Sequence, residues 1–314
     1  MNTSLSPRRL AVIFNPVGGS AKGGLIDRLE AACAVRGVEL VKLTTTATPG
    51  SARDLAKSCA ADKVRPVDAI IACGGDGTAC QAAEGLIASE IPLAVFPAGT
   101  GNLFARAFYS NPEPERFLDM IMHGHAQPID MIRLTTTSAS GQEYEQLFLV
   151  AVGLGKVSDA ISGASARMKR IFGKLTYVVR VAAATLRPQP ATYTIEGVGP
   201  DGTKREVTTR AAAVFALNAV PPSMLPLSRG CNASDGLLDV VLLKATSLFS
   251  LIGMSAHMAI GRPDSSPRYQ RLRCTTVKIT TSAPVTPNID GDPGTATTAM
   301  TLSVLPKAVR IIVS

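Results

Sequence analysis

The first 110 residues alternate short apolar runs with segments in which apolar residues recur at helical spacing. Four apolar runs have the length of β-strands: Leu10–Phe14, Val38–Leu43, Val67–Cys73 and Leu93–Phe96. Helical spacing predicts helices in the segments Leu25–Cys33, Ala52–Ala61, Ala79–Ile87 and Leu103–Phe108. Strands that alternate with helices in this order predict a doubly wound α/β domain, in which a parallel sheet carries helices on both faces.

From Met131 onward the pattern changes to β-like segments. The predicted strands are Met131–Thr135, Glu143–Val152, Ala191–Val198, Lys204–Thr209, Ala211–Ala219, Leu237–Leu243, Thr275–Thr281 and Met300–Leu305. Two helical insertions, Lys156–Leu186 and Ser247–Ile260, interrupt them. We therefore expect an α/β domain over 1–130 and a mainly antiparallel β-sandwich domain over 131–305. We expect residues 306–314 to form a C-terminal tail that packs back on the first domain.

Glycine-rich turns follow three of the four strands in the first domain. They are Asn15–Ser20, Gly74–Thr78 and Pro97–Asn102. Turns that follow parallel strands lie at the carboxyl edge of the sheet, where such folds bind ligands. Glycine lets the backbone approach a ligand closely, and a helix N-terminus attracts an anion, so these turns predict a phosphate site. Asp76 repels a polyphosphate unless Mg²⁺ lies between them or the carboxylate takes part in proton transfer. The alternative for each turn is an ordinary tight turn.

Composition narrows the classes of partner. The chain has 314 residues, is 46% hydrophobic and carries a net charge of +8. This charge suits nucleic acid, an anionic membrane surface or a phosphate-rich ligand. The sequence has no aromatic RNA-binding motif and no zinc-finger spacing, so we expect no nucleic-acid partner. The six cysteines lack metal or redox spacing, which indicates buried thiols in a reducing compartment. We expect a cytoplasmic protein, without a signal peptide or membrane span, that contacts an anionic membrane surface transiently.

Taken together, the motifs resemble those of the diacylglycerol kinase catalytic-domain family, in particular its soluble bacterial lipid kinases, with sphingosine and ceramide kinases as relatives. The matching pieces, in the order of the family, are Asn15–Gly24, Gly74–Thr78, Pro97–Arg106, Ile129-Asp130, Ala233–Val240 and Ile289–Asp292. The resemblance implies a two-domain fold with ATP in the cleft between the domains. It implies transfer of the γ-phosphate to the hydroxyl of diacylglycerol or a similar lipid, with a lipid-substrate role for the second domain.

The resemblance also implies roles for individual residues. The residues expected to bind the nucleotide are Asn15, Gly74, Gly75, Asp76, Gly77, Thr78, Thr100, Gly101 and Asn102. Asp290 is expected to act as the general base, and Asp76 with Asp130 to position Mg²⁺ and the phosphates. In relatives the aspartate of the Gly-Gly-Asp-Gly-Thr turn has also been assigned the base role, so both assignments stay open. For Asp290 the alternative is a turn residue in the sequence Asn-Ile-Asp-Gly-Asp-Pro.

A second metal site is implied by the resemblance at Asp235-Gly236. The carbonyl groups of Asn232 and Leu237 and the carboxylate of Asp235 would hold the cation, and oxygen ligands of this kind suit Mg²⁺ or Ca²⁺. The alternative is an Asp-Gly turn before the following strand.

Two positions depart from the family pattern. Cys80-Gln81 stands where the family commonly has Asn-Glu, and Asp292 stands where it has Glu. Both departures keep open a nucleotide-binding protein without kinase activity, and NAD kinase, which shares the Gly74–Thr78 motif, is the other alternative. The basic, amphipathic segment Lys156–Leu186 is expected either to contact the membrane or to pack between domains. The sequence leaves a homodimer open.

Overall fold

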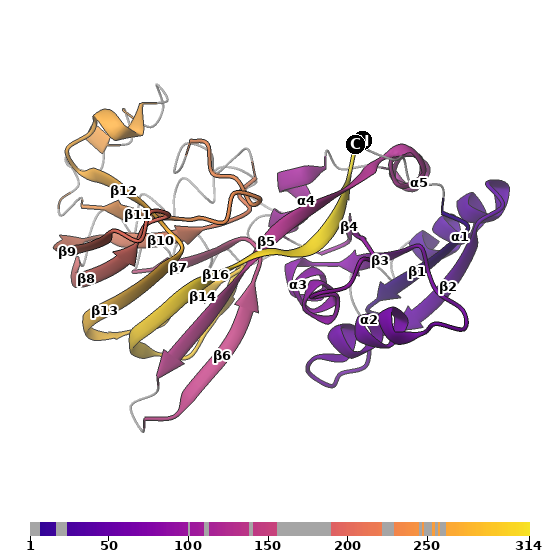
Figure 1. The fold of residues 1–314 in the computed structure, drawn as a ribbon, viewed down its shortest axis with the longest axis horizontal. Helices are drawn as coiled ribbons and strands as arrows, with labels where there is room; N and C mark the ends of the chain where they lie inside the picture. The colour runs from indigo at the N-terminus through magenta and orange to yellow at the C-terminus, as the bar shows by residue number, and fades with distance from the viewer. Residues whose placement is uncertain are drawn as a thin grey trace. The chain divides into compact units, whose positions relative to one another are not determined.

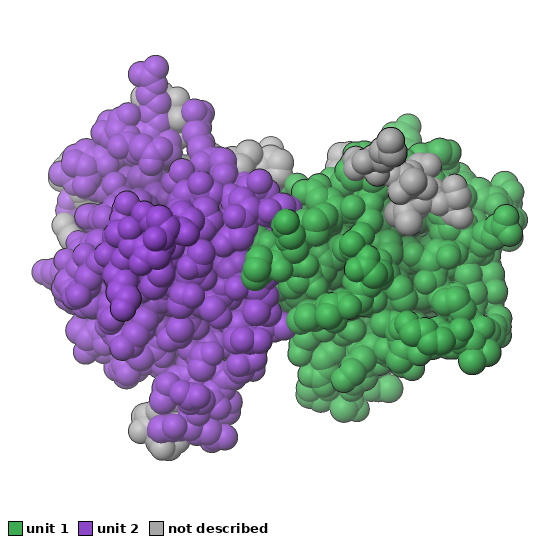
Figure 2. Space-filling view, in the orientation of Figure 1, with its two compact units in different colours: residues 1–131, 306–314 green, residues 132–305 purple. Residues whose placement is uncertain are grey.

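The structure is a computed structural model. It describes residues 7–16, 24–99, 101–109, 113–137, 141–155, 190–221, 229–244, 247, 253–254, 257 and 262–314. The chain divides into two units (Figures 1 and 2). Unit 1 comprises residues 1–131 and 306–314, and unit 2 comprises residues 132–305.

A parallel sheet forms the centre of unit 1. Its strands are β1 (Arg9–Phe14), β2 (Glu39–Thr44), β3 (Ala69–Gly74) and β4 (Leu93–Pro97), in the spatial order β2-β1-β3-β4. All six residues of β3 are buried, which explains why this strand reads as a continuous apolar run rather than an alternating one. The end of β16 (Thr297–Val313) pairs in parallel with β4 at Ile311 and Leu93.

Helices cover both faces of this sheet. On one face α1 (Leu25–Val35) and α5 (Pro114–His123) bury Leu29 and Phe117 in one apolar cluster with side chains of β1, β3 and β4. On the other face α2 (Ser51–Ala61) packs on β1 and α3 (Asp76–Gly85) packs on β3. Gly85 lets α3 approach α2 closely, since a Cβ atom there would lie 2.9 Å from the Ala56 Cβ. The doubly wound domain predicted from the sequence is confirmed.

Two antiparallel sheets form unit 2. The first contains β16, β13 (Thr276–Val285), β8 (Ala191–Val198) and β9 (Lys204–Ala211), while β5 (His125–Thr137) pairs with β16 and β6 (Glu143–Phe148). The strands of the second, in spatial order, are β12 (Tyr269–Cys274), β11 (Leu238–Leu243), β10 (Ala213–Leu217), β7 (Ala151–Leu154), β14 (Asn288–Ile289) and β15 (Asp292–Pro293).

Side chains from both sheets share one buried cluster. Tyr193, Ile279 and Leu302 of the first sheet lie in it with Val240 and Leu272 of the second. Each contributing strand turns alternate residues to this interior, as expected for packed antiparallel sheets. The β-sandwich predicted for the second part of the chain is confirmed.

Some element boundaries differ from those expected. Glu143–Val152 was expected as one strand, but it forms β6 and β7, which belong to different sheets and are separated at Leu149 and Val150. The helix expected from Ala79 begins at Asp76, because the last residues of the glycine turn already form its first turn. The strand β12, which contains two arginines and a glutamine among its six residues, was not predicted. The expected insertion Lys156–Leu186 and most of Ser247–Ile260 lie outside the described residues.

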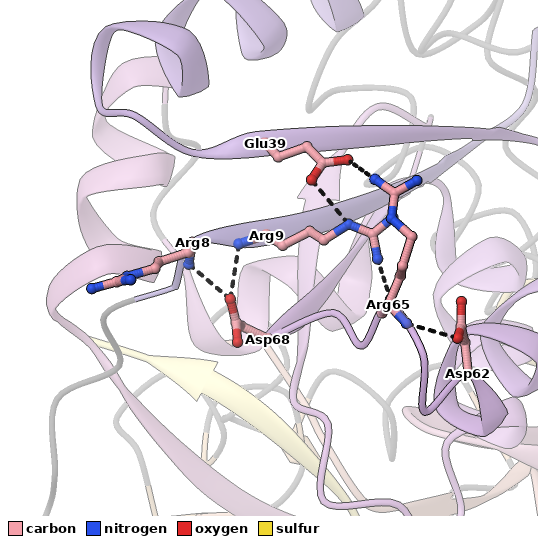
Figure 3. A network of polar contacts seen from close by, with 6 residues as sticks. All are labelled: Arg8, Arg9, Glu39, Asp62, Arg65 and Asp68. Carbon is pink, nitrogen blue, oxygen red and sulfur yellow. Dashed lines mark hydrogen bonds and ion pairs between the residues drawn. The ribbon is translucent and has the colours of Figure 1, made fainter.

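A network of charged residues ties together the amino ends of β1, β2 and β3 in unit 1 (Figure 3). The Asp68 carboxylate accepts the backbone N–H groups of Arg8 and Arg9 at 2.7 and 2.8 Å. The Arg9 and Arg65 guanidinium groups flank Glu39 at 3.2 and 2.8 Å. The network contains three arginines and three acidic residues, so its charges balance. These residues are Arg8, Arg9, Glu39, Asp62, Arg65 and Asp68. This network therefore anchors the edge of the sheet opposite the glycine turns.

Candidate functional site

The Gly74–Thr78 turn joins the end of β3 to the first turn of α3. Gly75 is the N-cap residue of α3, with φ −89° and ψ −173°. A Cβ atom on Gly74 would lie 2.6 Å from the Thr78 Oγ1 atom, so the Thr78 side chain needs a glycine at this strand end. The first N–H groups of a helix lack partners within the helix, and they give this turn the means to bind an anion.

The second glycine turn, Pro97–Asn102, meets the first at the backbone. The Ala98 N–H donates to the Gly74 carbonyl at 3.0 Å. A Cβ atom on Gly99 would overlap the Gly75 Cα atom and lie 2.9 Å from the Gly75 nitrogen. The two turns can approach this closely only because position 99 is glycine, whereas a Cβ atom on Gly75 would make an ordinary contact with the Gly99 Cα atom at 3.6 Å.

The amide of Asn102 fixes the shape of the second turn. Its Oδ1 atom accepts the Gly99 N–H at 2.9 Å, and its Nδ2 atom donates to the Gly99 carbonyl at 2.9 Å. Asn102 itself is in the left-handed conformation at φ 50° and directly precedes the helix α4 (Leu103–Phe108). Asparagine tolerates this backbone better than most residues. The side chain expected to hold the nucleotide thus organises the loop, and Thr100 lies outside the described residues.

The carboxylate of Asp76 links the two turns from the other side. Its Oδ1 atom accepts the Phe104 N–H in the first turn of α4 at 2.8 Å. A Cβ atom on Gly101 would lie 3.1 Å from its Oδ2 atom. Asp76 is half-buried, so the carboxylate is held in place at the surface of the turn.

Asn15 follows β1 and is exposed at the same edge of the sheet as the two turns. β1, β3 and β4 are parallel, with β3 between the other two, so their carboxyl ends lie side by side. Unit 1 therefore brings together the described members of the expected nucleotide set, which are Asn15, Gly74, Gly75, Asp76, Gly77, Thr78, Gly101 and Asn102.

Asp130 occupies a fully buried position on β5. Its side chain has 0% exposure, and its Oδ1 atom accepts the Lys307 N–H of β16 at 2.8 Å. Lys307 is in the left-handed conformation at φ 52°, so this bond holds a kink in the middle of a long strand. A buried carboxylate of this kind has no exposed surface for a hydrated cation, and its visible task is to join two strands. The expected role in positioning Mg²⁺ stays a prediction.

Asp290 lies in a two-residue hairpin turn between β14 and β15. Asp290 and the following Gly291 both have positive φ, 50° and 103°, as the tight turns of such hairpins require. Its carboxylate accepts three backbone N–H groups, those of Leu149, Val150 and Ala151, each at 2.9 Å. These three bonds separate β6 from β7.

Asp292 lies two residues beyond Asp290 on the same hairpin and is exposed. It replaces the glutamate that the family commonly has here. The other departure, Cys80-Gln81, lies on α3, and both of its residues are half-buried.

Asp235 lies in the turn before β11, and its carboxylate has partners within the chain. Its Oδ1 atom accepts the Leu237 N–H at 3.0 Å, and Gly236 in between has φ 73°. Its Oδ2 atom accepts a hydrogen bond from the Arg273 guanidinium. The Asn232 side chain accepts the Ser234 N–H at 3.1 Å. In the described part of the chain no three His, Cys, Asp or Glu side chains form a group that could hold a metal ion.

The residues Asn232, Asp235 and Leu237 thus do not fit the implied cation as they stand, because a guanidinium already neutralises the one carboxylate of the set. They fit the alternative, an Asp-Gly turn stabilised by its own backbone bonds.

Two contributors to these sites were not predicted from the sequence. Asn218 is buried, and its Nδ2 atom donates to the Leu149 carbonyl at 2.7 Å, so it holds the same segment that Asp290 binds. A lone polar residue after the apolar run of β10 was the available signal. Arg273, by contrast, stands among several arginines on β12 and its neighbourhood, and no local pattern distinguishes it.

Solved structures with the same fold include two kinase structures. A diacylglycerol kinase from Bacillus anthracis str. Sterne superposes with a TM-score of 0.70 at 22% identity, covering 99% of each chain. Yeast NADH kinase superposes with a TM-score of 0.53 at 13% identity, covering 98% of this chain and 84% of that chain. At these identities the likeness establishes the fold.

Sequence comparison identifies related families and proteins as well as the fold. Residues 9–134 match the diacylglycerol kinase catalytic domain, and residues 150–313 match the YegS C-terminal NAD kinase beta sandwich-like domain. Among curated proteins, the diacylglycerol kinase of Mycobacterium tuberculosis is 28% identical over 266 residues, covering 80% of each chain. The diacylglycerol kinase of Bacillus subtilis (strain 168) is 26% identical over 295 residues, covering 91% of this chain and 90% of that protein.

A kinase catalytic domain followed by a β-sandwich defines the class of protein, a phosphotransferase. The chain belongs to the diacylglycerol kinase catalytic-domain family of bacterial lipid kinases. The family predicted from the sequence is therefore confirmed. In the part of the chain that the structure describes, no helix is both long enough and apolar enough to cross a membrane.

Proposed function

We propose that this lipid kinase transfers the γ-phosphate of ATP to the hydroxyl of diacylglycerol or a similar lipid. The observation that carries the proposal is the contact between the two glycine turns of unit 1. Gly75 and Gly99 leave a surface of bare backbone beside the N-terminus of α3. Such a surface, with N–H groups and a helix dipole facing outward, suits the phosphates of a nucleotide.

In this proposal the two turns and Asn15 bind the phosphates. The backbone of Gly74, Gly75 and Gly77 and the hydroxyl of Thr78 contact them, while Asn102 keeps the second turn in shape. Gly101 belongs to the same turn, and Thr100, the remaining member of the expected set, lies outside the described residues. Phosphoryl transfer depends mainly on positioning and charge stabilisation, which backbone donors held this rigidly can supply.

Asp76 fits the role of Mg²⁺ ligand in this proposal. Mg²⁺ at nucleotide sites is usually held by one or two carboxylates together with the phosphates, and it neutralises charge on the transferred group. The Phe104 N–H holds the Asp76 carboxylate at the turn.

The proton of the lipid hydroxyl needs an acceptor, and three carboxylates are candidates for this role. Asp290 is the residue that the family pattern indicates, and its carboxylate accepts three backbone hydrogen bonds. Asp292 is the exposed carboxylate of the same hairpin, and Asp76 is the third candidate. Variants of the three residues separate these assignments.

The test is transfer of labelled γ-phosphate from ATP into a panel of lipids, with NAD⁺ assayed in parallel and with Mg²⁺ present or chelated. We expect a labelled lipid product that depends on Mg²⁺. Labelled NADP⁺ would instead support NAD kinase activity, which the fold shared with yeast NADH kinase makes the second candidate. ATP binding without any labelled product would support a protein without kinase activity.

The variants Asp290→Asn, Asp292→Asn and Asp76→Asn are assayed in the same way, each with its urea unfolding curve. The base is the residue whose substitution lowers kcat by about 100-fold or more in a variant that remains folded under the assay conditions. Loss of activity that follows unfolding of the variant identifies an anchoring residue instead. If all three variants keep wild-type kcat, the assigned mechanism is wrong.

A membrane surface is the proposed setting of the reaction, because a lipid substrate resides there. The net charge of +8 supports transient contact of a cytoplasmic protein with anionic lipids. Segment 156–186, which carries much of the basic amphipathic pattern, lies outside the described residues. Binding to vesicles with and without anionic lipid, at low and high salt, tests this part of the proposal.

A further inference from the structure

Two carboxylates and one guanidinium meet at the edge strand β12 of the second sheet in unit 2 and its neighbour β11. Asp239 on β11 and Arg273 on β12 are directly opposite each other in the antiparallel register. The Arg273 Nε atom lies 3.3 Å from the Asp239 Oδ1 atom, and the Nη2 atom of the same guanidinium donates to the Asp235 Oδ2 atom. One cationic group therefore bridges two acidic side chains.

Burial makes this bridge necessary. The Asp239 side chain is only 3% exposed, and that of Asp235 is 24% exposed. For the buried Asp239 an ionised carboxylate is strongly unfavourable unless a positive charge compensates it, whereas Asp235 belongs to an exposed turn. Arg273 can compensate both, because a guanidinium has several donors in a fixed plane.

Two further groups, Cys231 and Arg271, lie close to this bridge. Burial raises the pKa of the Cys231 thiol, and the nearby Asp239 raises it further, so this group is neutral at physiological pH. The Cys231 Sγ atom lies 3.0 Å from the Asn218 carbonyl oxygen. Arg271, two residues before Arg273 on β12, acts electrostatically on the same thiol and is a second positive group nearby.

We propose that the guanidinium of Arg273 takes the place of the divalent cation expected at Asn232, Asp235 and Leu237. Both oxygens of the Asp235 carboxylate already accept hydrogen bonds, one from the Leu237 N–H and one from Arg273. The Arg273 side chain thus supplies the positive charge that a bound cation would supply to this turn. The inference concerns the stability of unit 2 and does not depend on the proposed kinase activity.

The proposal predicts a fold that does not need Mg²⁺ or Ca²⁺ at this turn. The test uses the full chain, dialysed against EDTA, with its melting temperature measured in EDTA, in millimolar MgCl₂ and in millimolar CaCl₂. Mg²⁺ could also bind at the nucleotide turns, so the same series is run on Asp235→Asn. We expect the cations to shift the Tm of the wild type and of Asp235→Asn by the same amount.

Substitution of Arg273 should create the cation dependence that the wild type lacks. Arg273→Met leaves Asp235 and Asp239 without their shared partner, and we expect its Tm in EDTA to fall by about 5–10 °C. Mg²⁺ or Ca²⁺ should restore a large part of this loss. Arg133→Met is the matched control, because Arg133 pairs with the exposed Glu145 on the first sheet of the same unit, at 3.1 Å. It should lose about 2 °C or less and gain no response to cations.

Arg273→Lys tests the same proposal if Arg273→Met does not fold. A lysine ammonium keeps the charge but cannot reach two carboxylates with the geometry of a guanidinium, so its Tm should fall less and its response to cations should be smaller. Two results would overturn the proposal. One is a wild-type Tm that cations raise more than they raise that of Asp235→Asn. The other is one equivalent of bound Mg²⁺ or Ca²⁺ in elemental analysis of the wild type that Asp235→Asn lacks.

Discussion

At the scale of single residues, the candidate phosphate site depends on the contact between Gly75 and Gly99. The Asn102 amide and the Asp76 carboxylate fix the backbone around this contact, each through hydrogen bonds of 2.8–2.9 Å. A side chain added at Gly99 meets backbone rather than a flexible side-chain end, so the turns themselves would have to move apart. The geometry of the site is therefore sensitive to a single methyl group.

We predict that Gly99→Ala lowers the free energy of unfolding by about 2 kcal/mol and weakens nucleotide binding, because the turns must separate. Gly77→Ala is the matched control. No atom lies within 4 Å of a Cβ built there, so the substitution should leave stability unchanged or raise it slightly. Urea unfolding and calorimetric titration with ATP measure both effects. Weaker ATP binding in Gly77→Ala at full stability would support phosphate contact at this backbone, and a Gly99→Ala protein as stable as the wild type would contradict the packing argument.

Residue types at the site could be predicted because they leave local signals. The glycines of Gly74–Thr78 and the carboxylate of Asp76 stand between an apolar strand and a helix, and this pattern is readable within a few residues. The bonds from Asp76 to Phe104 and from Asp235 to Arg273 join residues 28 and 38 positions apart, and nothing local encodes them. The burial of Asp130 could not be predicted for the same reason, because its partner Lys307 is 177 positions away in the sequence.

At the scale of elements, the short hairpin of β14 and β15 organises the strand break between β6 and β7. Ile289 pairs with Val152, and the Asp290 carboxylate receives the N–H groups of the three residues where one sheet gives way to the other. A side chain thus replaces the strand partner that these N–H groups would otherwise need. This is why the β-like segment Glu143–Val152, which predicts one strand, yields two.

We predict that Asp290→Asn destabilises the segment between β6 and β7. An amide offers one acceptor oxygen without charge to three donors, so the free energy of unfolding should fall by about 2 kcal/mol. The backbone itself should tolerate asparagine, which is well suited to the left-handed conformation. Hydrogen exchange at Leu149, Val150 and Ala151 should accelerate, whereas Asp292→Asn should leave these amides protected. Unchanged exchange in Asp290→Asn would show that the carboxylate does not hold the break.

At the scale of the whole molecule, none of the six cysteines forms a disulfide, and several thiols lie deep in the packing of both units. Burial raises the pKa of Cys73 to about 12, and those of Cys33 and Cys274 to about 11. Cys33 and Cys73 lie in the core of unit 1 and Cys274 in that of unit 2. Both units therefore contain groups that resist ionisation only while the chain is folded.

This predicts a loss of stability in alkali. Below about pH 8.5 the thiols are protonated in both states, and their contribution is fully present. Between that pH and about 11 the unfolded chain releases protons that the folded chain keeps. Each thiol then lowers the free energy of unfolding by up to about 1.4 kcal/mol per pH unit. Urea unfolding at pH 7.5 and pH 10 measures the change. Cys73→Ala, although less stable at neutral pH, should lose less between the two pH values, and an equal loss would contradict this account.

Unit 1 is assembled from two stretches of chain that are far apart in sequence. Residues 306–314 return to it after the whole of unit 2, where Ile311 aligns with Leu93 of β4 and the Ile312 carbonyl accepts the Tyr109 hydroxyl at 2.8 Å. A ribosome makes these residues after unit 2. The sheet of unit 1 therefore stays incomplete during synthesis. The edge of β4 has no strand partner from β16 while some 170 further residues are translated. Folding during synthesis cannot finish one unit before starting the next, and the unit that is begun first is completed last.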